Sequence, residues 1–260
     1  MMQATDLSGR HFIITGAAGG IGSALARELA GVGARLSLVD LQAGPLELLV
    51  AELEQMPGYD SAIALAADVS KAADVESYVS RATGKHGPVD GFFNNAAIEG
   101  PSYSIVDYPV EDFERVLDVN VKGVWLGMKY VIPVMNERGG SIIITSSFAG
   151  VRGSPNLSGY ITSKHAVIGI MRTACLELAP SNIRVNTLHP GMVDTEMAQR
   201  IAQNSGLGEE GFAEAVSGSV PLGRYAQPQD VVAMVCFLFS DAASYCNGSE
   251  YFVDGGIRAG

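Results

Sequence analysis

Residues 12–22 read FIITGAAGGIG, a short apolar run that leads into a glycine-rich turn. The run is typical of a buried strand, and helical periodicity begins at Gly20. Glycine permits positive φ angles and close backbone approach, while the N-terminus of a helix offers unpaired N–H groups to an anion. The turn therefore predicts a pyrophosphate site formed by Gly16, Gly19, Gly20, Ile21 and Gly22. Its spacing is G-x-x-x-G-x-G instead of G-x-G-x-x-G, so tight packing alone is the alternative.

The alternation of apolar run and helical stretch recurs along the chain. The predicted strands are Phe12–Thr15, Arg35–Asp40, Ala62–Ala67, Val89–Asn94, Ser141–Ser146, Arg184–Leu188 and Glu250–Val253. The predicted helices are Gly20–Val32, Pro45–Met56, Lys71–Lys85, Val110–Asn136, Tyr160–Leu178 and Pro228–Phe239. This order favours an α/β fold, a doubly wound sheet of seven mainly parallel strands with helices on both faces. No linker or internal repeat divides the chain, so we expect a single domain over residues 1–260.

Composition narrows the function classes. Hydrophobic residues make up 47% of the chain and charged residues 17%, as in a packed globular protein. The net charge is −11 with only 17 Lys and Arg, so we expect neither a nucleic-acid nor a membrane partner. The three cysteines show no disulfide or zinc pattern, and we expect no metal. The apolar run Val231–Phe239 is shorter than the about 20 residues of a membrane span, and Met1–Thr15 is no secretory signal, which predicts a cytoplasmic protein.

Asp40 ends the second predicted strand, 18 residues after Gly22. A carboxylate at this position can accept hydrogen bonds from an adenosine ribose. It would also lie close to a 2′-phosphate, and two like charges about 4 Å apart repel by about 4 kcal/mol at an effective dielectric of about 20. Leu41, which follows, offers no cation to such a phosphate, so NAD is the expected coenzyme. The alternative is that Asp40 only starts a surface turn.

Asp68 follows the third predicted strand in the same way. Its carboxylate could accept from an adenine amino group, with Val69 under the ring. An equal alternative is a turn carboxylate that precedes a helix capped by Ser70.

Tyr160 and Lys164 are four residues apart in a predicted helix, so their side chains share one face. A phenol with a pKa of about 10 is a poor base near neutral pH, and a shift of about 3 units requires about 4 kcal/mol. Burial raises the pKa of a tyrosine, whereas an ammonium about 4 Å away lowers it by a comparable amount. Lys164, assisted by the positive ring of an oxidised nicotinamide, would make Tyr160 a competent acid/base. On its own, Y-x-x-x-K is more often a surface pair.

Ser146 and Ser147 end the fifth predicted strand, at the edge where open α/β sheets bind ligands. A serine there can hold a carbonyl or carbinol oxygen beside the tyrosine. A polar residue that only closes a strand is about as common.

Together these motifs resemble the short-chain dehydrogenase/reductase family. The resemblance is carried, in the family's order, by Thr15–Gly22, Asn94-Asn95-Ala96-Ala97, Asn120, Ser147, Tyr160-x-x-x-Lys164, His189-Pro190-Gly191 with Thr195, and Val253-Asp254-Gly255-Gly256. It covers nearly the whole chain and implies a single Rossmann-type domain, a homotetramer and an NAD-dependent alcohol dehydrogenase or ketone reductase. Ser147 stands thirteen positions before Tyr160, the family's usual separation, so the catalytic serine is placed there. Ala97 departs from the family's usual glycine.

The resemblance also implies residue roles. Tyr160 would give or take the proton, Ser147 would orient the substrate oxygen, and Lys164 would hold the nicotinamide ribose and lower the pKa of the tyrosine. Asn120 would anchor a water that links Lys164 to solvent. The other implied coenzyme contacts are Asn94 on the adenosine side, Pro190 and Thr195 at the carboxamide, and Ala96, Gly191 and Val193. His189 has no implied proton-transfer role, and we expect it to be packed and hydrogen-bonded.

The substrate side is less defined. Residues 191–220 break the alternation of strand and helix, and an insertion of this length predicts a lid or binding loop. The candidate substrate contacts are Ser147, Phe148, Asn156, Tyr160, Met192 and Met197, with Glu99, Arg152, Ser154, Glu196, Ile201 and Phe212 as further pocket residues. This mainly apolar set predicts a medium-sized cyclic or aromatic alcohol or ketone.

Two predicted helices, Val110–Asn136 and Tyr160–Leu178, carry apolar residues on more than one face, including Val121, Val124, Trp125, Met128, Val167, Ile170 and Met171. Apolarity all round a helix indicates burial, which another subunit could provide. The residues alone do not separate a dimer from the tetramer that the resemblance implies.

Two other function classes share part of this pattern. A nucleotide-sensing protein with the same fold would have no need of the full set of Asn120, Ser147, Tyr160 and Lys164. A methyltransferase also binds an adenosine ribose through an acid after its second strand, but it has no use for a paired tyrosine and lysine. An NAD-dependent oxidoreductase that acts on a small-molecule alcohol or ketone is therefore the favoured function.

Overall fold

The structure is a computed structural model, and it describes residues 5–204 and 208–259. The described residues form seven strands, β1 (His11–Thr15), β2 (Arg35–Asp40), β3 (Ser61–Ala66), β4 (Gly91–Asn94), β5 (Gly140–Thr145), β6 (Ile183–Pro190) and β7 (Glu250–Val253). They make one sheet in the order β3-β2-β1-β4-β5-β6-β7, and every neighbouring pair is parallel. The predicted α/β fold with a seven-stranded, doubly wound sheet is confirmed.

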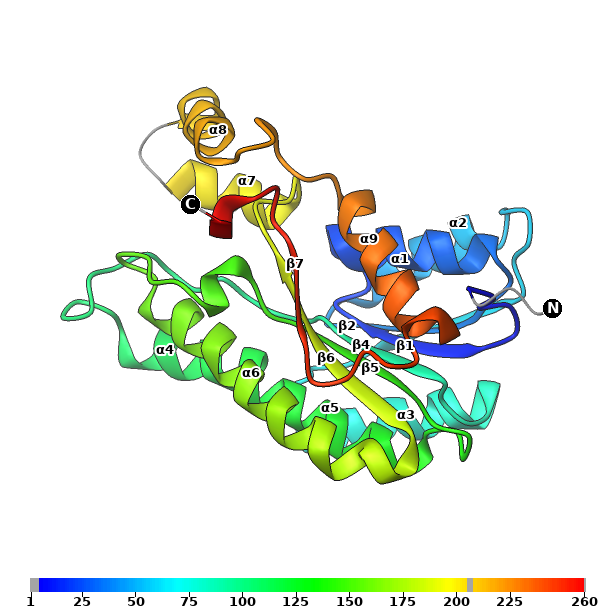
Figure 1. Cartoon of the computed structure of the whole chain (residues 1–260). Helices are drawn as coiled ribbons and strands as arrows, with labels where there is room; N and C mark the ends of the chain where they lie inside the picture. Colours follow the sequence, from blue (N-terminus) through cyan, green and yellow to red (C-terminus); the bar gives the residue numbers. More distant parts are fainter. Residues whose placement is uncertain (1–4, 205–207, 260) are drawn as a thin grey trace.

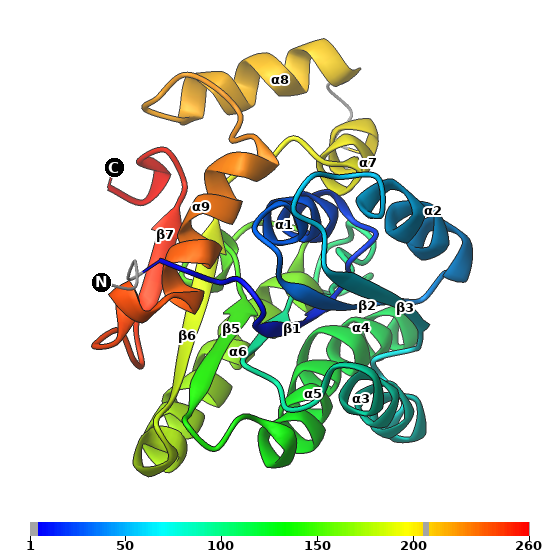
Figure 2. The same cartoon turned by 90° about the vertical axis from the view of Figure 1, so that its right-hand side faces the viewer.

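Helices cover both faces of the sheet (Figure 1, Figure 2). One face carries α1 (Gly20–Gly31), α2 (Ala43–Leu53) and α9 (Pro228–Phe239), and the other carries α3 (Ala72–His86), α4 (Val110–Leu117), α5 (Gly123–Val131) and α6 (Ser158–Leu178). Side chains alternate along each strand, so Phe12 and Ile14 pack under α1 and α9 while Ile13 packs in the core of the opposite face. Two buried faces explain the continuous apolar runs of β1 and β5, Phe12–Ile14 and Ile142–Ile144. None of the helices in the described ranges is long and apolar enough to cross a membrane.

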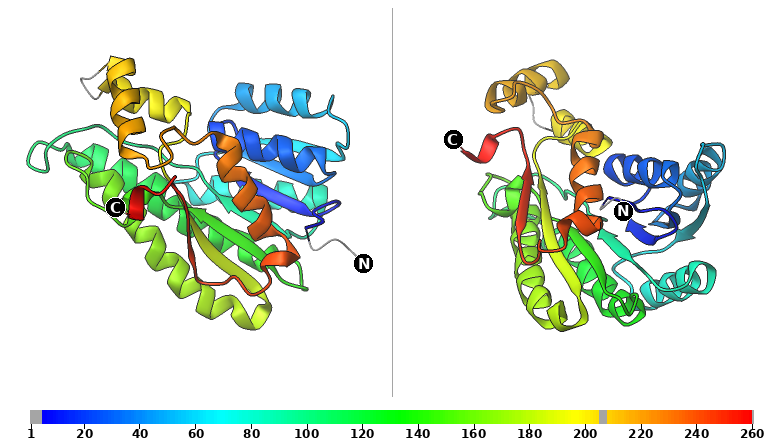
Figure 3. Two further views of the ribbon diagram at one scale, coloured as in Figure 1. Left: turned by 45° about the horizontal axis from the view of Figure 1, so that its top comes forward. Right: turned by 45° about the vertical axis from the view of Figure 1, so that its right-hand side comes forward.

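The chain between β6 and α9 forms two further helices, α7 (Glu196–Asn204) and α8 (Gly208–Ser219). Figure 3 shows them, in yellow and orange, at one end of the sheet in both views. The sequence predicted a lid or binding loop at residues 191–220 and no helix within it, and the structure shows two helices there. Residues 205–207 of that segment lie outside the described part of the chain. Helix α7 begins where the carbonyl and hydroxyl of Thr195 accept from the N–H groups of Gln199 and Ala198, at 3.0 and 3.4 Å.

The predicted helix Val110–Asn136 is divided in the structure. A π-helical turn, Asp118–Lys122, separates α4 from α5, and a 3-10 turn, Ile132–Val134, follows α5. A π turn holds more residues than an α turn, so it rotates the residues after it around the helix axis. Both Val124 of α5 and Val167 of α6 are buried in the chain's own core, whereas Trp125 is 51% exposed. Much of the apolarity of these helices therefore needs no second subunit.

The direction of the strand order reverses beside β1. The chain runs from β1 outward to β2 and β3, then returns to β4 on the other side of β1. The hydroxyl of Thr15 accepts from the N–H groups of Asn95 and Ala96 at 2.9 and 3.1 Å, and so joins the ends of β1 and β4. Asn94, which ends β4, donates from Nδ2 to the carbonyl of Val124 at 2.8 Å. Open α/β sheets bind ligands at the carboxyl ends of the strands at such a reversal.

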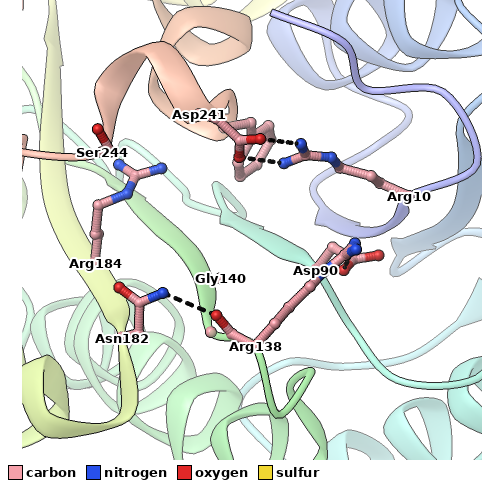
Figure 4. Close-up of a pocket in the computed structure, with 10 residues that line it drawn as sticks. Arg10, Asp90, Arg138, Gly140, Asn182, Arg184, Asp241 and Ser244 are labelled. Carbon is pink, nitrogen blue, oxygen red and sulfur yellow. Dashed lines mark hydrogen bonds and ion pairs between the residues drawn. The ribbon is translucent and has the colours of Figure 1, made fainter. Parts of the chain in front are cut away.

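Ion pairs and hydrogen bonds connect the segments at the amino ends of the strands, opposite the carboxyl ends (Figure 4). Arg10 donates to both carboxylate oxygens of Asp241 at 3.0 and 2.7 Å, and Arg138 donates to Asp90 at 2.7 Å. Arg184 donates to the carbonyl of Leu238, near the end of α9, at 2.6 Å. Each of these cations has an acceptor, and the cluster lies away from the carboxyl ends of the strands. We therefore assign it a structural role.

Two buried histidines make the stability of the fold sensitive to acid. His86 lies between Ser37 of β2 and Ser61 of β3, with ring nitrogens 3.2 and 3.1 Å from their hydroxyl oxygens. His11 contacts the same Ser37 at 2.9 Å. Burial lowers the pKa of His86 to about 4 and also lowers the pKa of His11. The folded protein therefore keeps His86 neutral in a pH range where the unfolded chain protonates it.

We expect the free energy of unfolding to fall by about 2 kcal/mol between about pH 6.5 and about pH 4 because of this pair. The sign follows from the lowered pKa: in this window the unfolded chain binds more protons, so acid favours unfolding. Urea denaturation at neutral and at acidic pH measures the change. The substitution His86→Gln should reduce the pH dependence, and an unchanged dependence in that variant would refute the assignment.

Candidate active site

The glycine-rich turn joins β1 to α1 and lies against the turn that follows β4. Gly16 has a φ of 65°, and a Cβ there would lie 3.0 Å from the Cα of Ala96. A Cβ on Gly22 would overlap the carbonyl oxygen of Gly16. The first-turn amides of α1 have no acceptor within the helix. Glycine backbone without side chains and the free N–H groups at the start of α1 therefore lie together in this turn. Such a turn fits the pyrophosphate of a dinucleotide.

Asp40 holds the same turn from the end of β2. Its Oδ2 accepts from the N–H of Ala18 at 3.0 Å, and its Oδ1 accepts from the N–H of Leu41 at 2.7 Å. The side chain of Leu41 is 63% exposed beside it. The turn interpretation and the ribose interpretation are both compatible with these contacts, because each carboxylate oxygen can accept more than one hydrogen bond.

Asp68 and Val69 follow β3. Oδ1 of Asp68 accepts from the N–H and the hydroxyl of Ser70 at 3.0 and 2.6 Å, and Oδ2 lies 3.4 Å from Nζ of Lys71. These contacts are the turn that the sequence offered as one alternative. The predicted cap at Ser70 is wrong, because Lys71 precedes α3 and the Ser70 hydroxyl donates to Asp68. Val69 packs against α5, where a Cβ on Gly123 would lie 3.0 Å from its Cγ2. Contact of Asp68 and Val69 with an adenine stays a prediction.

Tyr160 lies in the first turn of α6 and meets Ser147, which follows β5. The Oγ of Ser147 accepts from the N–H of Ala149 at 3.1 Å, which orients the serine. Burial raises the pKa of Tyr160 to about 12, a hydrogen bond with Ser147 lowers it, and the charge of Glu99 raises it. The structure therefore brings the phenol and the serine hydroxyl together and keeps the phenol protonated at neutral pH.

Lys164 is buried one helical turn after Tyr160. Its Nζ lies 5.5 Å from the centroid of the tyrosine ring and donates to the carbonyl of Thr145 at 2.9 Å. Burial lowers the pKa of Lys164 to about 8. The ammonium of Lys164 thus lies over the face of the tyrosine ring and is held by Thr145. The resemblance implies a lowered pKa for Tyr160, whereas the structure raises it. Burial of the phenol is the physical reason for this difference.

Asn120 lies in the π-helical turn and is buried. Its Oδ1 accepts from the N–H of Ile98 at 2.8 Å, and its Nδ2 donates to the carbonyl of Ile98 at 2.8 Å and to Oγ of Ser163 at 3.0 Å. Ser163 in turn donates to the carbonyl of Tyr160 at 2.7 Å. Asn120 therefore links the loop after β4 to the helix of the tyrosine. Both of its amide hydrogens are used, so a relay water would have to donate to an oxygen of Asn120.

The segment after β6 approaches the glycine-rich turn. A Cβ on Gly20 would lie 2.7 Å from Cγ2 of Thr195, although the two residues are far apart in the sequence. Pro190 ends β6, and a Cβ on Gly191 would lie 2.8 Å from the Cα of Asp254. Val193 is buried, and its carbonyl accepts from the Thr195 hydroxyl at 3.3 Å. The predicted pyrophosphate and carboxamide sites are therefore neighbours.

His189 is packed and hydrogen-bonded, as expected. It is fully buried in β6, with Nδ1 2.8 Å from the carbonyl oxygen of Ser147 and Nε2 2.9 Å from Oγ1 of Thr187. Its ring stacks on Phe252 with centroids 4.5 Å apart. Burial lowers the pKa of His189. The histidine fixes the backbone of Ser147 and gives it a defined orientation.

Comparison with known proteins agrees with this arrangement. A family model described as enoyl-(acyl carrier protein) reductase matches residues 16–258. Levodione reductase of Leifsonia aquatica is 38% identical over 98% of this chain and 96% of its own length. The chain belongs to the short-chain dehydrogenase/reductase family.

Solved structures and a further relative support the family assignment. A crystal structure of levodione reductase matches with a TM-score of 0.93 at 36% identity, covering 97% of this chain and 99% of that chain. The structure of NAD+-bound xylitol dehydrogenase matches with a TM-score of 0.91 at 34% identity, covering 96% and 99%. Cyclohexanol dehydrogenase of Acinetobacter sp. (strain SE19) is 37% identical over 94% of this chain and 92% of its own length. The protein is an oxidoreductase, and this family uses a nicotinamide coenzyme.

An apolar cluster includes two of the predicted substrate contacts. Phe148 and Met192, both predicted substrate contacts, pack against Val216 and Val220 of α8 and its end and against Ile257 near the C-terminus. The last three were missed in the sequence. The spacing of Val216 and Val220 is helical and could have signalled a packed helix, whereas nothing local pairs Ile257 with them.

The other predicted substrate residues are placed differently. Asn156 is exposed in a left-handed conformation with a φ of 65°, and its carbonyl accepts from the N–H of Tyr103 at 3.0 Å. Met197 is partly buried in α7, and the side chain of Phe212 lies outside the described part of the chain. Glu99 forms an ion pair with Arg200 of α7 at 2.6 Å. Arg200 was also missed, because its partner is 101 residues away in the sequence.

Proposed function

We propose that this protein is an NAD-dependent dehydrogenase that interconverts a secondary alcohol and its ketone. The observation that carries the proposal is the meeting of Tyr160 and Ser147 at the carboxyl edge of the sheet, next to the apolar cluster around Phe148 and Met192. That cluster favours a medium-sized, mostly apolar substrate that is cyclic or aromatic. The names of levodione reductase and cyclohexanol dehydrogenase refer to cyclic compounds, which supports the same class.

Tyr160 is the proposed acid/base of the reaction. A bound nicotinamide supplies or accepts the hydride and, when oxidised, brings a positive ring to the site. During alcohol oxidation Tyr160 takes the proton of the substrate hydroxyl, and during ketone reduction it returns a proton to the same oxygen. Ser147, oriented by the N–H of Ala149, holds that oxygen by a hydrogen bond.

Magnitudes show why one cation is insufficient for this step. The pKa of Tyr160 is raised to about 12, and bringing it to about 7 requires about 7 kcal/mol. One positive charge about 4 Å away contributes about 4 kcal/mol at an effective dielectric of about 20. Two such charges, Lys164 and an oxidised nicotinamide, would meet the requirement if both acted from about that distance, whereas Lys164 alone would not. We assign Lys164 the nicotinamide ribose as well, with Asn120 supporting the helix that carries both residues.

The test of this function is a substrate panel. Purified protein with NADH and a set of cyclic and aromatic ketones should show loss of nicotinamide absorbance, and NAD with the matching alcohols should show its gain. Acyl thioesters belong in the same panel, because the matching family model is described as an enoyl-(acyl carrier protein) reductase. Turnover of thioesters with none of the ketones would contradict the proposal.

Asp40 sets the proposed preference for NAD over NADP. The substitution Asp40→Asn removes the charge but keeps an acceptor for the N–H of Ala18, so the turn should hold its shape. We expect kcat/KM with NADP to rise by about 10²-fold or more, since removal of a repulsion of about 4 kcal/mol is worth up to about 10³-fold. The ratio of kcat/KM for the two coenzymes measures the change. Asp60→Asn, an exposed residue before β3, controls for overall charge, and an equal ratio in both variants would assign the preference elsewhere.

We also propose a cytoplasmic homotetramer with one catalytic domain per chain. All three cysteines are free, which suits a reducing compartment. Val110, Trp125 and Leu176 leave apolar side chains exposed on α4, α5 and α6, which suits contacts between copies of the chain. Residues 191–220, which include α7 and α8, are the proposed substrate lid.

A further inference from the structure

An ion pair joins α7 to the loop that follows β4. Nε of Arg200 donates to Oε1 of Glu99 at 2.6 Å, and Nη2 lies 3.4 Å from Oε2. The side chain of Glu99 is 19% exposed and that of Arg200 is 51% exposed. A carboxylate that is mostly removed from water is costly unless a cation pairs with it. Arg200 supplies that cation from a helix on the substrate side of the molecule.

Glu99 acts electrostatically on the proposed acid/base. Ile98, which precedes Glu99, is bound by Asn120, and Asn120 donates to Ser163 on the helix of Tyr160 at 3.0 Å. From this loop the charge of Glu99 raises the pKa of Tyr160, in addition to the larger effect of burial. Nζ of Lys164 lies 5.5 Å from the centroid of the same ring. Loss of the cation at Glu99 would leave a bare carboxylate near a phenol that has to ionise.

Further charged groups surround this ion pair. Asp112 and Arg115 of α4 line the same hollow as Glu99 and Arg200. Glu196, one turn before Arg200 on α7, lies 3.9 Å from its Nη1 and is 89% exposed, so solvent screens it strongly. Arg200 is the cation with direct hydrogen bonds to Glu99.

Helix α7 also begins at a proposed coenzyme contact. Thr195 caps its first turn through the N–H of Ala198, and Gly20 of the glycine-rich turn lies against Thr195. Arg200 follows on the same helix. The ion pair therefore joins the helix that starts beside the glycine-rich turn to the loop that follows β4.

We propose that Arg200 is a positioning residue for proton transfer, which neutralises Glu99 beside Tyr160 and fixes α7 over the substrate. Arg200 acts through Glu99 and not on the reacting atoms. The inference deepens the proposed function and rests on it for the reaction that Tyr160 serves. It extends the site to a residue that no sequence motif marks.

The first test is the pH dependence of kcat/KM for alcohol oxidation in Arg200→Gln. The limb that rises as Tyr160 ionises should move to higher pH by about one unit, and kcat/KM near neutral pH should fall by about tenfold. Glu99→Gln should move the limb in the opposite direction, because Arg200 then lacks its carboxylate. The double variant Glu99→Gln/Arg200→Gln should return the limb toward its original position. Arg200→Lys, which keeps the charge, should leave the limb close to its wild-type position.

A matched control exists between α1 and α2. Arg27 of α1 pairs with Glu52 of α2 through two hydrogen bonds of 2.6 and 2.8 Å, with side chains 43% and 49% exposed. Arg27→Gln breaks an arginine–glutamate pair of the same kind and should leave the pH profile unchanged. If Arg200→Gln and Glu99→Gln leave the limb in place, or move it in the same direction, Arg200 has no role in proton transfer.

A second readout needs no turnover. The tyrosinate absorbance of the NAD complex, corrected by the matching Tyr160→Phe protein, should show Tyr160 ionising at higher pH in Arg200→Gln than in the wild type. Amide hydrogen exchange in α7 should rise several-fold in the same variant and stay unchanged in Arg27→Gln. Failure of the wild-type protein to oxidise any alcohol would refute the proposed function, whereas an unshifted tyrosinate titration would refute the role of Arg200. Should Arg200→Gln not fold, the opposite shift expected in Glu99→Gln decides the question.

Discussion

The substitution Tyr160→Phe should lower kcat/KM by about 10²–10⁴-fold, because it removes the group that exchanges the proton with the substrate oxygen. Coenzyme affinity should change by no more than a few-fold. The phenylalanine ring keeps the contact with Lys164, and the glycine-rich turn and Asp40 lie on other elements. Steady-state kinetics and titration of NADH fluorescence measure the two quantities separately.

The control for this experiment is Tyr245→Phe. Tyr245 is fully exposed at 102% and lies outside the site, so its loss of a hydroxyl should leave both turnover and NADH affinity unchanged. A Tyr160→Phe protein with most of the wild-type turnover would place proton transfer on another group. Equal losses of NADH binding and turnover would indicate that the variant is misfolded. A thermal unfolding curve like that of the wild type would rule out misfolding.

The substitution Gly22→Ala should weaken coenzyme binding strongly, because it displaces the backbone of the glycine-rich turn. The added methyl would overlap the carbonyl oxygen of Gly16 and lie 2.8 Å from the Cα of Ala17. Both are backbone atoms of the turn and cannot rotate away, so the start of α1 has to move. We expect a loss of about 3 kcal/mol in the free energy of unfolding and a fall in NADH affinity of at least about 10²-fold.

Gly19→Ala in the same turn is the matched comparison. Gly19 has a φ of −73°, which alanine adopts without strain, and its Cβ would meet the Gly16 carbonyl oxygen at an ordinary distance of 3.4 Å. Its free energy of unfolding should therefore stay within about 0.5 kcal/mol of the wild type. Chemical denaturation measures both variants, and equal losses of stability would show that steric overlap at Gly22 is not the cause.

Much of the fold follows from the sequence for a simple reason. The strand β1 buries Phe12 and Ile14 on one face and Ile13 on the other, so a fully apolar run predicts a strand that is covered on both sides. Helices α7 and α8 were not predicted. Their segment carries Gly206, Gly208, Gly211 and Gly218, and glycine lowers helix propensity. Packing of Val216 and Val220 against Ile257, which is tertiary, overrides that propensity.

The candidate site divides in the same way. The position of Ser147 at the ligand-binding edge was predictable, because the carboxyl ends of parallel strands meet there. The shared helix face of Tyr160 and Lys164 was predictable from their four-residue spacing. The contact of Lys164 with the carbonyl of Thr145 was not predictable, since backbone acceptors leave no trace in the sequence. The pairing of Glu99 with Arg200 spans 101 residues and has no local pattern. Sequence reasoning therefore finds the reacting groups more readily than the groups that adjust them.

The π-helical turn at Asp118–Lys122 makes the active site depend on chain length as well as on residue identity. Deletion of one residue there would remove the π turn and leave an ordinary helix. The later side chains of α5 would keep their directions, because the π turn holds about one residue more than an α turn. The side chain of Asn120 would no longer be placed to form its hydrogen bonds with Ile98 and Ser163, although all three residues were still present. Natural variation in this helix should consequently be confined to replacements, with insertions and deletions accumulating outside it.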